Sequence, residues 1–213
     1  MCSGRVDLGF IQKAFASGQD GVFIGACRLN ECNYVTHGNY DAFGNVLIFK
    51  KIMQEHLGLD PGRLHIEFMS AADGNILAES VNRFVGQVKA LGPVGQSEGV
   101  DPEKLRLRLK AVGRLVPYLR LVERERFRIP VKTREAYEEF YGSREFDRLY
   151  RELIGDRLAM SQIMLLLAQK PMTTGEMAEI VGLNQSEISG YMNSSSRQGL
   201  VRYDEAQKRY ALA

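Results

Sequence analysis

The sequence lacks the features that direct a chain into or across a membrane. Its 213 residues begin with no basic region followed by an apolar stretch, and no apolar run reaches the roughly 18 residues that a membrane span needs. We therefore predict a cytoplasmic protein with no membrane partner. A hydrophobic content of 45% suffices for a buried core, and the length suits one large domain or two small ones.

Cysteine is also scarce, and the three cysteines are Cys2, Cys27 and Cys32. An odd number argues against a disulfide framework and favours thiol chemistry or metal binding in a reducing compartment. The sequence has no glycine motif for phosphate or dinucleotide binding and no convincing Ser/His/Asp set. We therefore expect a non-catalytic protein whose chemistry lies in its cysteines.

Residues 1–93 show the order helix, strand, helix, strand, helix, which is typical of an open α/β domain with a parallel sheet. Short apolar runs predict the two strands at residues 21–26 and 64–69. A two-stranded parallel sheet cannot be covered on both faces and remain stable alone. We therefore expect the domain to lack its first strand, with the missing strands supplied by an absent N-terminal segment or by a partner.

The rest of the chain predicts a linker, a helical region and a second domain. Gly, Pro, Ser and Gln mark the linker at residues 92–100, and residues 94–155 as a whole are predicted as linker and charged helical connector. Half of the Lys and Arg residues lie between Lys104 and Arg151. Residues 156–213 predict a helix, a helix-turn-helix and a hairpin, which is the plan of a winged-helix domain.

The third helix of the predicted winged-helix domain has few cations. It carries Gln, Ser and Asn side chains with Arg197 as its only basic residue, and Glu187 opposes that charge. Affinity for nucleic acid depends heavily on Lys and Arg contacts to phosphates. We therefore expect this domain to dock a protein, with DNA binding as the main rival and a nucleic-acid partner disfavoured.

Cys27 and Cys32 stand in the loop after the first predicted strand, where open α/β sheets place their sites. Several iron–sulfur patterns use a four-residue gap between cysteines, although two such residues are more often ordinary small hydrophobes. Cys2 precedes the first helix and reaches the same sheet edge if a strand comes before it. We therefore predict Cys2, Cys27 and Cys32 as cofactor and metal ligands.

Histidine adds one candidate ligand. His37 is the nearest candidate for a fourth position, because histidine replaces thiolate on one iron in some clusters. A solvated loop side chain is the alternative for His37. We interpret His56, at a helix end, and His65, in a strand, as structural residues.

Several motifs over residues 1–94 together resemble one family. They are Met1-Cys2-Ser3-Gly4-Arg5-Val6-Asp7, Gly18 to Cys27, Cys32-Asn33-Tyr34, Gly38-Asn39-Tyr40, Arg63 to Ser70 and Gly92-Pro93. In this order and spacing they resemble the delta, iron–sulfur subunit of methyl-viologen-reducing hydrogenase. The family commonly has a histidine after each loop cysteine; here Arg28 and Asn33 stand at those positions.

The resemblance implies an electron-transfer subunit with a [2Fe–2S] cluster. One implied partner is a heterodisulfide-reductase-type flavin subunit, and the others are hydrogenase, formate dehydrogenase or NADH dehydrogenase subunits. Members of that family begin earlier, with a strand and a cysteine-containing segment, so we hypothesise a reading frame that starts late, for example after a selenocysteine codon. At least one cluster ligand is then expected from outside this chain, from an absent N-terminal segment or from a neighbouring subunit.

Two other functions remain open. The first is a redox-responsive DNA-binding regulator in which the cysteines sense and the winged helix binds an operator. The second is an inert fragment whose cysteines are buried thiols.

Overall fold

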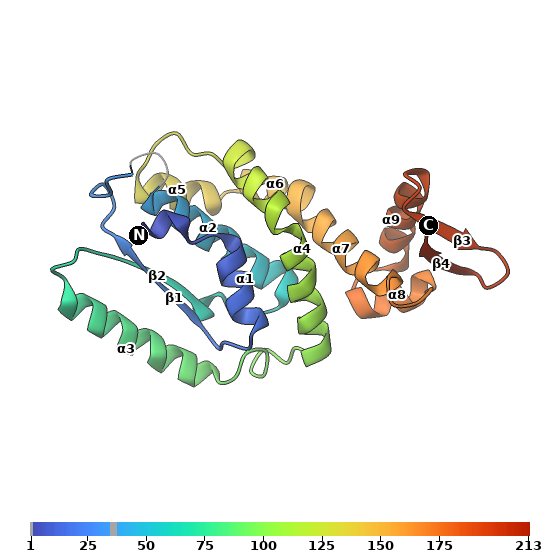
Figure 1. Cartoon of the computed structure of the whole chain (residues 1–213), viewed down its shortest axis with the longest axis horizontal. Coiled ribbons are helices and arrows are strands. Elements are labelled where there is room, and N and C mark those ends of the chain that lie inside the picture. The colour runs from blue at the N-terminus through green and yellow to red at the C-terminus, as the bar shows by residue number, and fades with distance from the viewer. Residues whose placement is uncertain (1, 35–37) are drawn as a thin grey trace. The chain divides into compact units, whose positions relative to one another are not determined.

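The computed structural model describes residues 2–34 and 38–213 of the chain. These residues form two compact units, Met1–Ile154 and Gly155–Ala213 (Figure 1). Within the described residues, no helix is long and apolar enough to cross a membrane.

Unit 1 is built on a sheet of two parallel strands. Strand β1 (Val22–Cys27) pairs with β2 (Leu64–Met69) in a register that runs from Val22 opposite Leu64 to Cys27 opposite Met69. Both strands are rich in the apolar residues that favour a buried sheet. Because the strands are parallel, the loops that follow Cys27 and Met69 leave the same edge of the sheet.

Helices lie on both faces of this sheet. Helix α3 (Gly74–Leu91) lies along one face, and α1 (Leu8–Ala16) and α2 (Asn39–Ile52) lie along the other (Figure 1). The Asp7 carboxylate caps α1 by accepting from the N–H of Gly9 at 2.8 Å. This cap fixes the point at which the N-terminal segment enters the domain.

The second half of unit 1 is helical and packs against the α/β layers. It comprises α4 (Pro102–Arg126), α5 (Arg134–Tyr141) and α6 (Arg144–Tyr150). Helix α4 packs along α1, where the Gln12 side chain donates to the Leu109 carbonyl at 2.9 Å. Helix α5 packs on α2 by stacking the Tyr137 ring on that of Phe43. The helices predicted as a connector are therefore part of the same compact unit as the sheet.

Two π-helical turns interrupt the helical parts of the chain. One extends α2 over Met53–Leu57, and the other covers Arg151–Gly155 after α6. A short 3-10 turn, Pro61–Arg63, leads into β2, and another, Ser3–Arg5, precedes α1.

Unit 2 has a core of three helices and a two-stranded hairpin. Helices α7 (Asp156–Leu167), α8 (Thr174–Val181) and α9 (Gln185–Arg197) are followed by antiparallel β3 (Val201–Asp204) and β4 (Arg209–Leu212). Gly182 adopts a φ of 83° at the end of α8, which permits the tight turn into α9. The expected fold class, a small parallel α/β domain with a helical region and a winged helix, is confirmed.

Candidate functional site

The three cysteines meet at the carboxyl-terminal edge of the sheet. Cys27 is the last residue of β1, Cys32 stands in the loop that follows, and Cys2 precedes the first 3-10 turn. The Sγ atoms of Cys2 and Cys32 lie 3.8 Å apart, and Cys27 lies close enough for both of these thiols to raise its pKa. Residues separated by 30 positions in the sequence thus share one cluster of thiols.

Cys32 is the thiol most strongly supported by backbone donors. Burial by itself raises the pKa of Cys32, but the backbone N–H groups of Tyr34 and Asn39 hydrogen bond to its sulfur and lower the pKa below its usual value. Asn39 is the first residue of α2, so one of these N–H groups belongs to a helix N-terminus, which favours a negative charge. The fold therefore favours the thiolate form of Cys32.

Cys27 shows the opposite shift. Burial raises the pKa of Cys27, and nearby negative charge on Cys32 and Cys2 raises it further. Cys27 is exposed, whereas Cys2 and Cys32 are half-buried. A bound cation would relieve this repulsion between the thiolates.

Two residues at the start of α2 contact the cysteine loop. A Cβ on Gly38 would lie 2.5 Å from the Cys32 Sγ atom and 2.3 Å from the Tyr34 carbonyl oxygen, so only glycine fits there. The Asn39 side chain donates to the carbonyl oxygens of Cys27 and Arg28 at 2.8 and 2.7 Å. The sequence motif Gly38-Asn39-Tyr40 had marked the segment without indicating these roles.

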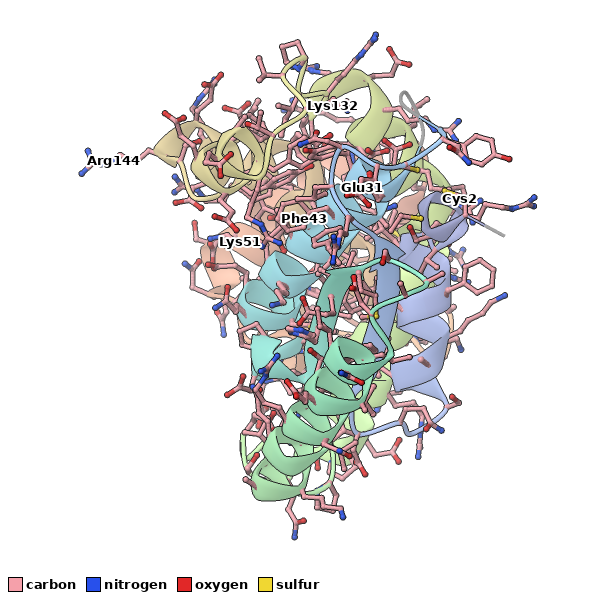
Figure 2. All side chains as sticks on the ribbon, turned by 90° about the vertical axis from the view of Figure 1, so that its left-hand side faces the viewer. Cys2, Glu31, Phe43, Lys51, Lys132 and Arg144 are labelled. Carbon is pink, nitrogen blue, oxygen red and sulfur yellow. The ribbon has the colours of Figure 1, made fainter. Side chains whose placement is uncertain are left out.

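An ion pair joins the two loops at this edge. Arg28, directly after Cys27, contacts Asp73 in the loop after β2 at 2.7 Å. The Asp73 carboxylate also accepts from the backbone N–H of Ser70 at 2.7 Å. Figure 2 shows Cys2 beside the loop that carries Glu31, the neighbour of Cys32. These contacts hold the cysteine loop against the end of β2.

An open groove borders the thiols at Cys2. Its lining comes from the N-terminal segment, α1, β1, α2 and α4: Cys2, Ser3, Gly4, Arg5, Val6, Asp7, Phe10, Gly25, Asp41, Asn45, Arg120, Glu123 and Arg124. The Asp7 carboxylate pairs with Arg120 across this groove. Cys2 is therefore the thiol that faces the surface groove.

The donor set fits a thiolate-bound metal group in part. Thiolates that share one tetrahedral ion at a metal–sulfur distance of about 2.3 Å lie about 3.8 Å apart, and the Cys2–Cys32 separation is 3.8 Å. Across residues 2–34 and 38–213, however, no group of three or more His, Cys, Asp or Glu side chains is arranged to hold a metal ion. The match to a metal site is therefore limited to the distance between the Cys2 and Cys32 sulfurs.

The histidines fall into two groups. His37, the candidate fourth ligand, lies outside the described residues. His65 packs its ring near those of Phe23 and Phe84, with centroids 5.5 and 5.9 Å away, as expected of a structural residue. Burial, with a contribution from Arg108, lowers the pKa of His56 to about 3, so this ring is neutral in the fold.

Unit 2 presents a second surface, on α9 and the hairpin. Glu187 is engaged at the helix N-terminus, where its carboxylate accepts from the Asn184 N–H at 2.9 Å. Glu176 pairs with Arg209 at 3.0 Å. The Tyr203 and Tyr210 rings lie side by side across the hairpin, with centroids 4.9 Å apart, and Tyr203 is exposed. This surface is polar on α9 and aromatic on the hairpin.

Comparisons with known proteins match each unit separately. Residues 1–92 match the family described as methyl-viologen-reducing hydrogenase, delta subunit. Residues 159–203 match the family described as bacterial regulatory protein, arsR family. The second match covers α8, α9 and most of α7, as expected for a winged helix.

Relatives of the first unit include two kinds of protein. One subunit of a ferredoxin- and F420H2-dependent CoB–CoM heterodisulfide reductase from Methanosarcina acetivorans is 42% identical over 45% of this chain and 12% of its own length. The iron–sulfur subunit of the F420-non-reducing hydrogenase from Archaeoglobus profundus is 39% identical over 43% of this chain and 66% of its length. The corresponding vhu iron–sulfur subunit from Methanopyrus kandleri is 36% identical over 44% of this chain and 69% of its length.

The matched region is short relative to some of these proteins. It spans about one eighth of the relative from the heterodisulfide reductase and about two thirds of the hydrogenase subunits. The match to most of the length of the hydrogenase subunits agrees with the sequence motifs and the thiol cluster at the sheet edge. Through its first 92 residues, this chain belongs to the methyl-viologen-reducing hydrogenase delta subunit family.

Proposed function

We propose that this protein is an electron-transfer subunit that holds an iron–sulfur cluster, of the [2Fe–2S] type, with Cys2, Cys27 and Cys32. The observation that carries the proposal is the convergence of the three thiols, with two sulfurs 3.8 Å apart at the edge of a parallel sheet. A cluster of this kind supplies a site that accepts and releases one electron. Three cysteines leave at least one ligand position to be filled from elsewhere.

The chain's own groups support such a role in two ways. The backbone N–H groups that bond to Cys32 stabilise its thiolate form and the negative charge that thiolate ligands bring. Cys2 lines the groove on the protein surface. We propose that this half-buried thiol provides the side of the site toward which a redox partner docks.

The partners are proposed from the relatives. Some are named as heterodisulfide reductase subunits and others as hydrogenase iron–sulfur subunits. We therefore propose a flavin subunit of the heterodisulfide reductase type on one side of the transfer and a hydrogenase on the other. Formate dehydrogenase and NADH dehydrogenase, expected from the resemblance, find no support among these relatives.

Anaerobic purification tests the cluster. The whole chain, produced with iron and sulfide available, should show iron–sulfur absorption and an electron paramagnetic resonance signal after reduction. Cys27→Ser and Cys32→Ser should each lose most of the bound iron, whereas Glu31→Ser, an exposed neighbour in the same loop, should keep it. Iron retention in all three variants would refute the proposal.

A second candidate function is duplex DNA binding by unit 2. The arsR-family match and the hairpin next to α9 favour it, because winged helices place one helix in the major groove. On this proposal the duplex contacts come from the polar face of α9 and from the basic residues Arg197, Arg202 and Lys208.

Fluorescence anisotropy with a labelled duplex tests this second function. Binding should weaken steeply with salt, since it rests on phosphate contacts, and Arg202→Ala together with Lys208→Ala should weaken it for every sequence. Lys170→Ala, an exposed cation on the α7–α8 connection, is the matched control. Absence of salt-dependent binding in the parent chain excludes DNA as the ligand.

A further inference from the structure

The side chain of Asn39 makes two hydrogen bonds to the start of the cysteine loop. Its side-chain Nδ2 atom donates to the carbonyl oxygens of Cys27, at 2.8 Å, and Arg28, at 2.7 Å. The preceding residue, Gly38, packs so closely on Cys32 that a Cβ there would lie 2.5 Å from the Cys32 sulfur. We infer that Asn39 is a positioning residue, which ties the end of β1 to the Cys32 loop and so keeps Cys27 with the other two thiols.

Burial gives these contacts their strength. Asn39 is only 2% exposed, so water does not compete for its amide group. As the first residue of α2, it is held by a helix that is buried over most of its length. A side chain fixed in this way restrains the loop more firmly than a side chain on a mobile support.

The other contacts of the loop do not replace this restraint. The Arg28 side chain that pairs with Asp73 is 47% exposed, and exposed pairs contribute little. The Tyr40 hydroxyl donates to the Asn30 side chain at 3.0 Å, which holds the loop three residues beyond Cys27. Within the described residues, the buried side chain that donates to the Cys27 carbonyl oxygen is that of Asn39.

The chemistry of the amide is also specific. An asparagine amide has two N–H groups and serves two carbonyl oxygens at once, whereas an aspartate of the same shape has only acceptors when ionised. Asn39→Asp therefore keeps the volume and the backbone, but places a carboxylate against two carbonyl oxygens. The end of β1 should move away from the Cys32 loop.

Gln12 offers a matched control for this change. It is also buried, at 8% exposed, and its amide donates to the Leu109 carbonyl at 2.9 Å, between α1 and α4. Gln12→Glu makes the same change from amide to acid, at similar burial and in the same unit. A general loss of stability should affect both variants, whereas a loss of thiol placement should affect Asn39→Asp alone.

A reagent that reacts with pairs of neighbouring thiols measures how close the cysteines lie in the metal-free protein. Phenylarsine oxide bridges two thiols that lie close together, and mass spectrometry of the digested protein identifies the bridged pair. In the metal-free parent chain we expect bridges between Cys2 and Cys32 and bridges that include Cys27. In Asn39→Asp, and in Asn39→Ala, bridges with Cys27 should fall about tenfold relative to the Cys2–Cys32 bridge, the size of effect typical of groups that orient ligands.

This inference rests on the proposed function, because the thiols that Asn39 positions are the proposed cluster ligands. The outcomes of the experiment nevertheless distinguish the two. An unchanged ratio of bridges in both Asn39 variants, or the same change in Gln12→Glu, overturns the inference. If the ratio changes as expected but the parent chain binds no iron, the inference stands and the proposed function fails. Cluster binding reduced about 10- to 100-fold in Asn39→Asp and unchanged in Gln12→Glu supports both.

Discussion

At the scale of single residues, Arg63 holds together the end of unit 1 opposite the thiols. Its side chain is completely buried and donates to the carbonyl oxygens of Leu91, Gly92 and Pro93, at the C-terminal end of α3. It also contacts the Glu98 carboxylate at 2.6 Å. A cation at this position satisfies the last carbonyls of the helix and complements its dipole.

We expect Arg63→Met to lower the free energy of unfolding by about 3–5 kcal/mol, because it leaves Glu98 and several carbonyls buried without their partner. Urea denaturation of the whole chain measures this. Arg106→Met is the control, since its pair with Glu103 is exposed on both sides and should contribute at most about 1 kcal/mol. Equal losses in the two variants would show that Arg63 has no special role.

The same pair predicts a pH dependence. Burial raises the pKa of Glu98, but the hydrogen bonds from Arg63, the Asp60 N–H and neighbouring groups together outweigh burial and lower the pKa to about 2, from an ordinary value of 4.5. The unfolded chain therefore binds the proton first as the pH falls. This carboxylate stabilises the fold above pH 4.5, and its contribution should be lost as the pH falls from about 4.5 to about 2.

Denaturation midpoints between about pH 6 and pH 3 check this expectation. Glu98→Gln should be less stable than the parent chain at about pH 6, and the difference should shrink toward about pH 3 because the parent then loses its own contribution. Glu103→Gln, at the exposed pair, should show little change across the range. A difference that stays constant with pH would contradict the assignment to Glu98.

The sequence predicted that the three cysteines lie together, but not which groups hold them. Cys2, Cys27 and Cys32 stand out because thiols are rare and chemically distinctive, and the strand pattern placed two of them at a sheet edge. The donors on Cys32 are backbone N–H groups, which every residue but proline has, so no residue type marks them. Asn39 acts through a side chain that, in sequence, is equally typical of a turn or a cap.

At the scale of elements, the apolar pattern predicted the regular parts well. Strand β2 covers the predicted residues 64–69, and β1 differs from its prediction by one residue at each end. A single helix is predicted between the two strands, yet its last turn in the structure, Met53–Leu57, is π-helical. A π-turn adds one residue to a turn without changing which residue types are apolar, so periodicity does not reveal it.

The helix caps of unit 2, unlike a π-turn, depend on side-chain type. Thr173 accepts from the Glu176 N–H at 3.2 Å, and the Glu176 carboxylate accepts from the Thr173 N–H at 2.7 Å. Together they form a capping box at the start of α8. The same carboxylate pairs with Arg209 on β4, so the cap also joins the helix to the hairpin.

We expect Thr173→Ala to destabilise unit 2 by about 0.5–2 kcal/mol, the usual effect of losing an N-cap hydroxyl. Thermal unfolding of the whole chain, followed by hydrogen exchange in α8, measures this. Thr174→Ala is the control, because Thr174 is the first helical residue and its hydroxyl is not the cap. A larger effect from Thr174→Ala than from Thr173→Ala would contradict this cap assignment.

At the scale of the whole molecule, each unit has a core of its own. Unit 1 buries Ile48 completely, on α2 beneath the sheet, and unit 2 buries Ile188 completely, on α9. The sequence indicated two domains through the change from an α/β pattern to a helix-turn-helix pattern. It did not indicate that α4 and α5 pack on α1 and α2, because amphipathic helices carry no mark of the surface that they cover.

Because each unit has its own core, we expect each unit to unfold locally with its own free energy. Truncating a buried isoleucine to alanine costs about 2–5 kcal/mol, through lost burial and the cavity left behind. Ile48→Ala should therefore speed hydrogen exchange in α2, β1 and β2, and Ile188→Ala should speed it in α7, α8 and α9, with each variant leaving the other set near its parent rate. Faster exchange in both sets from either substitution would show that the units unfold as one, and the thiol site would then depend on the winged helix for its stability.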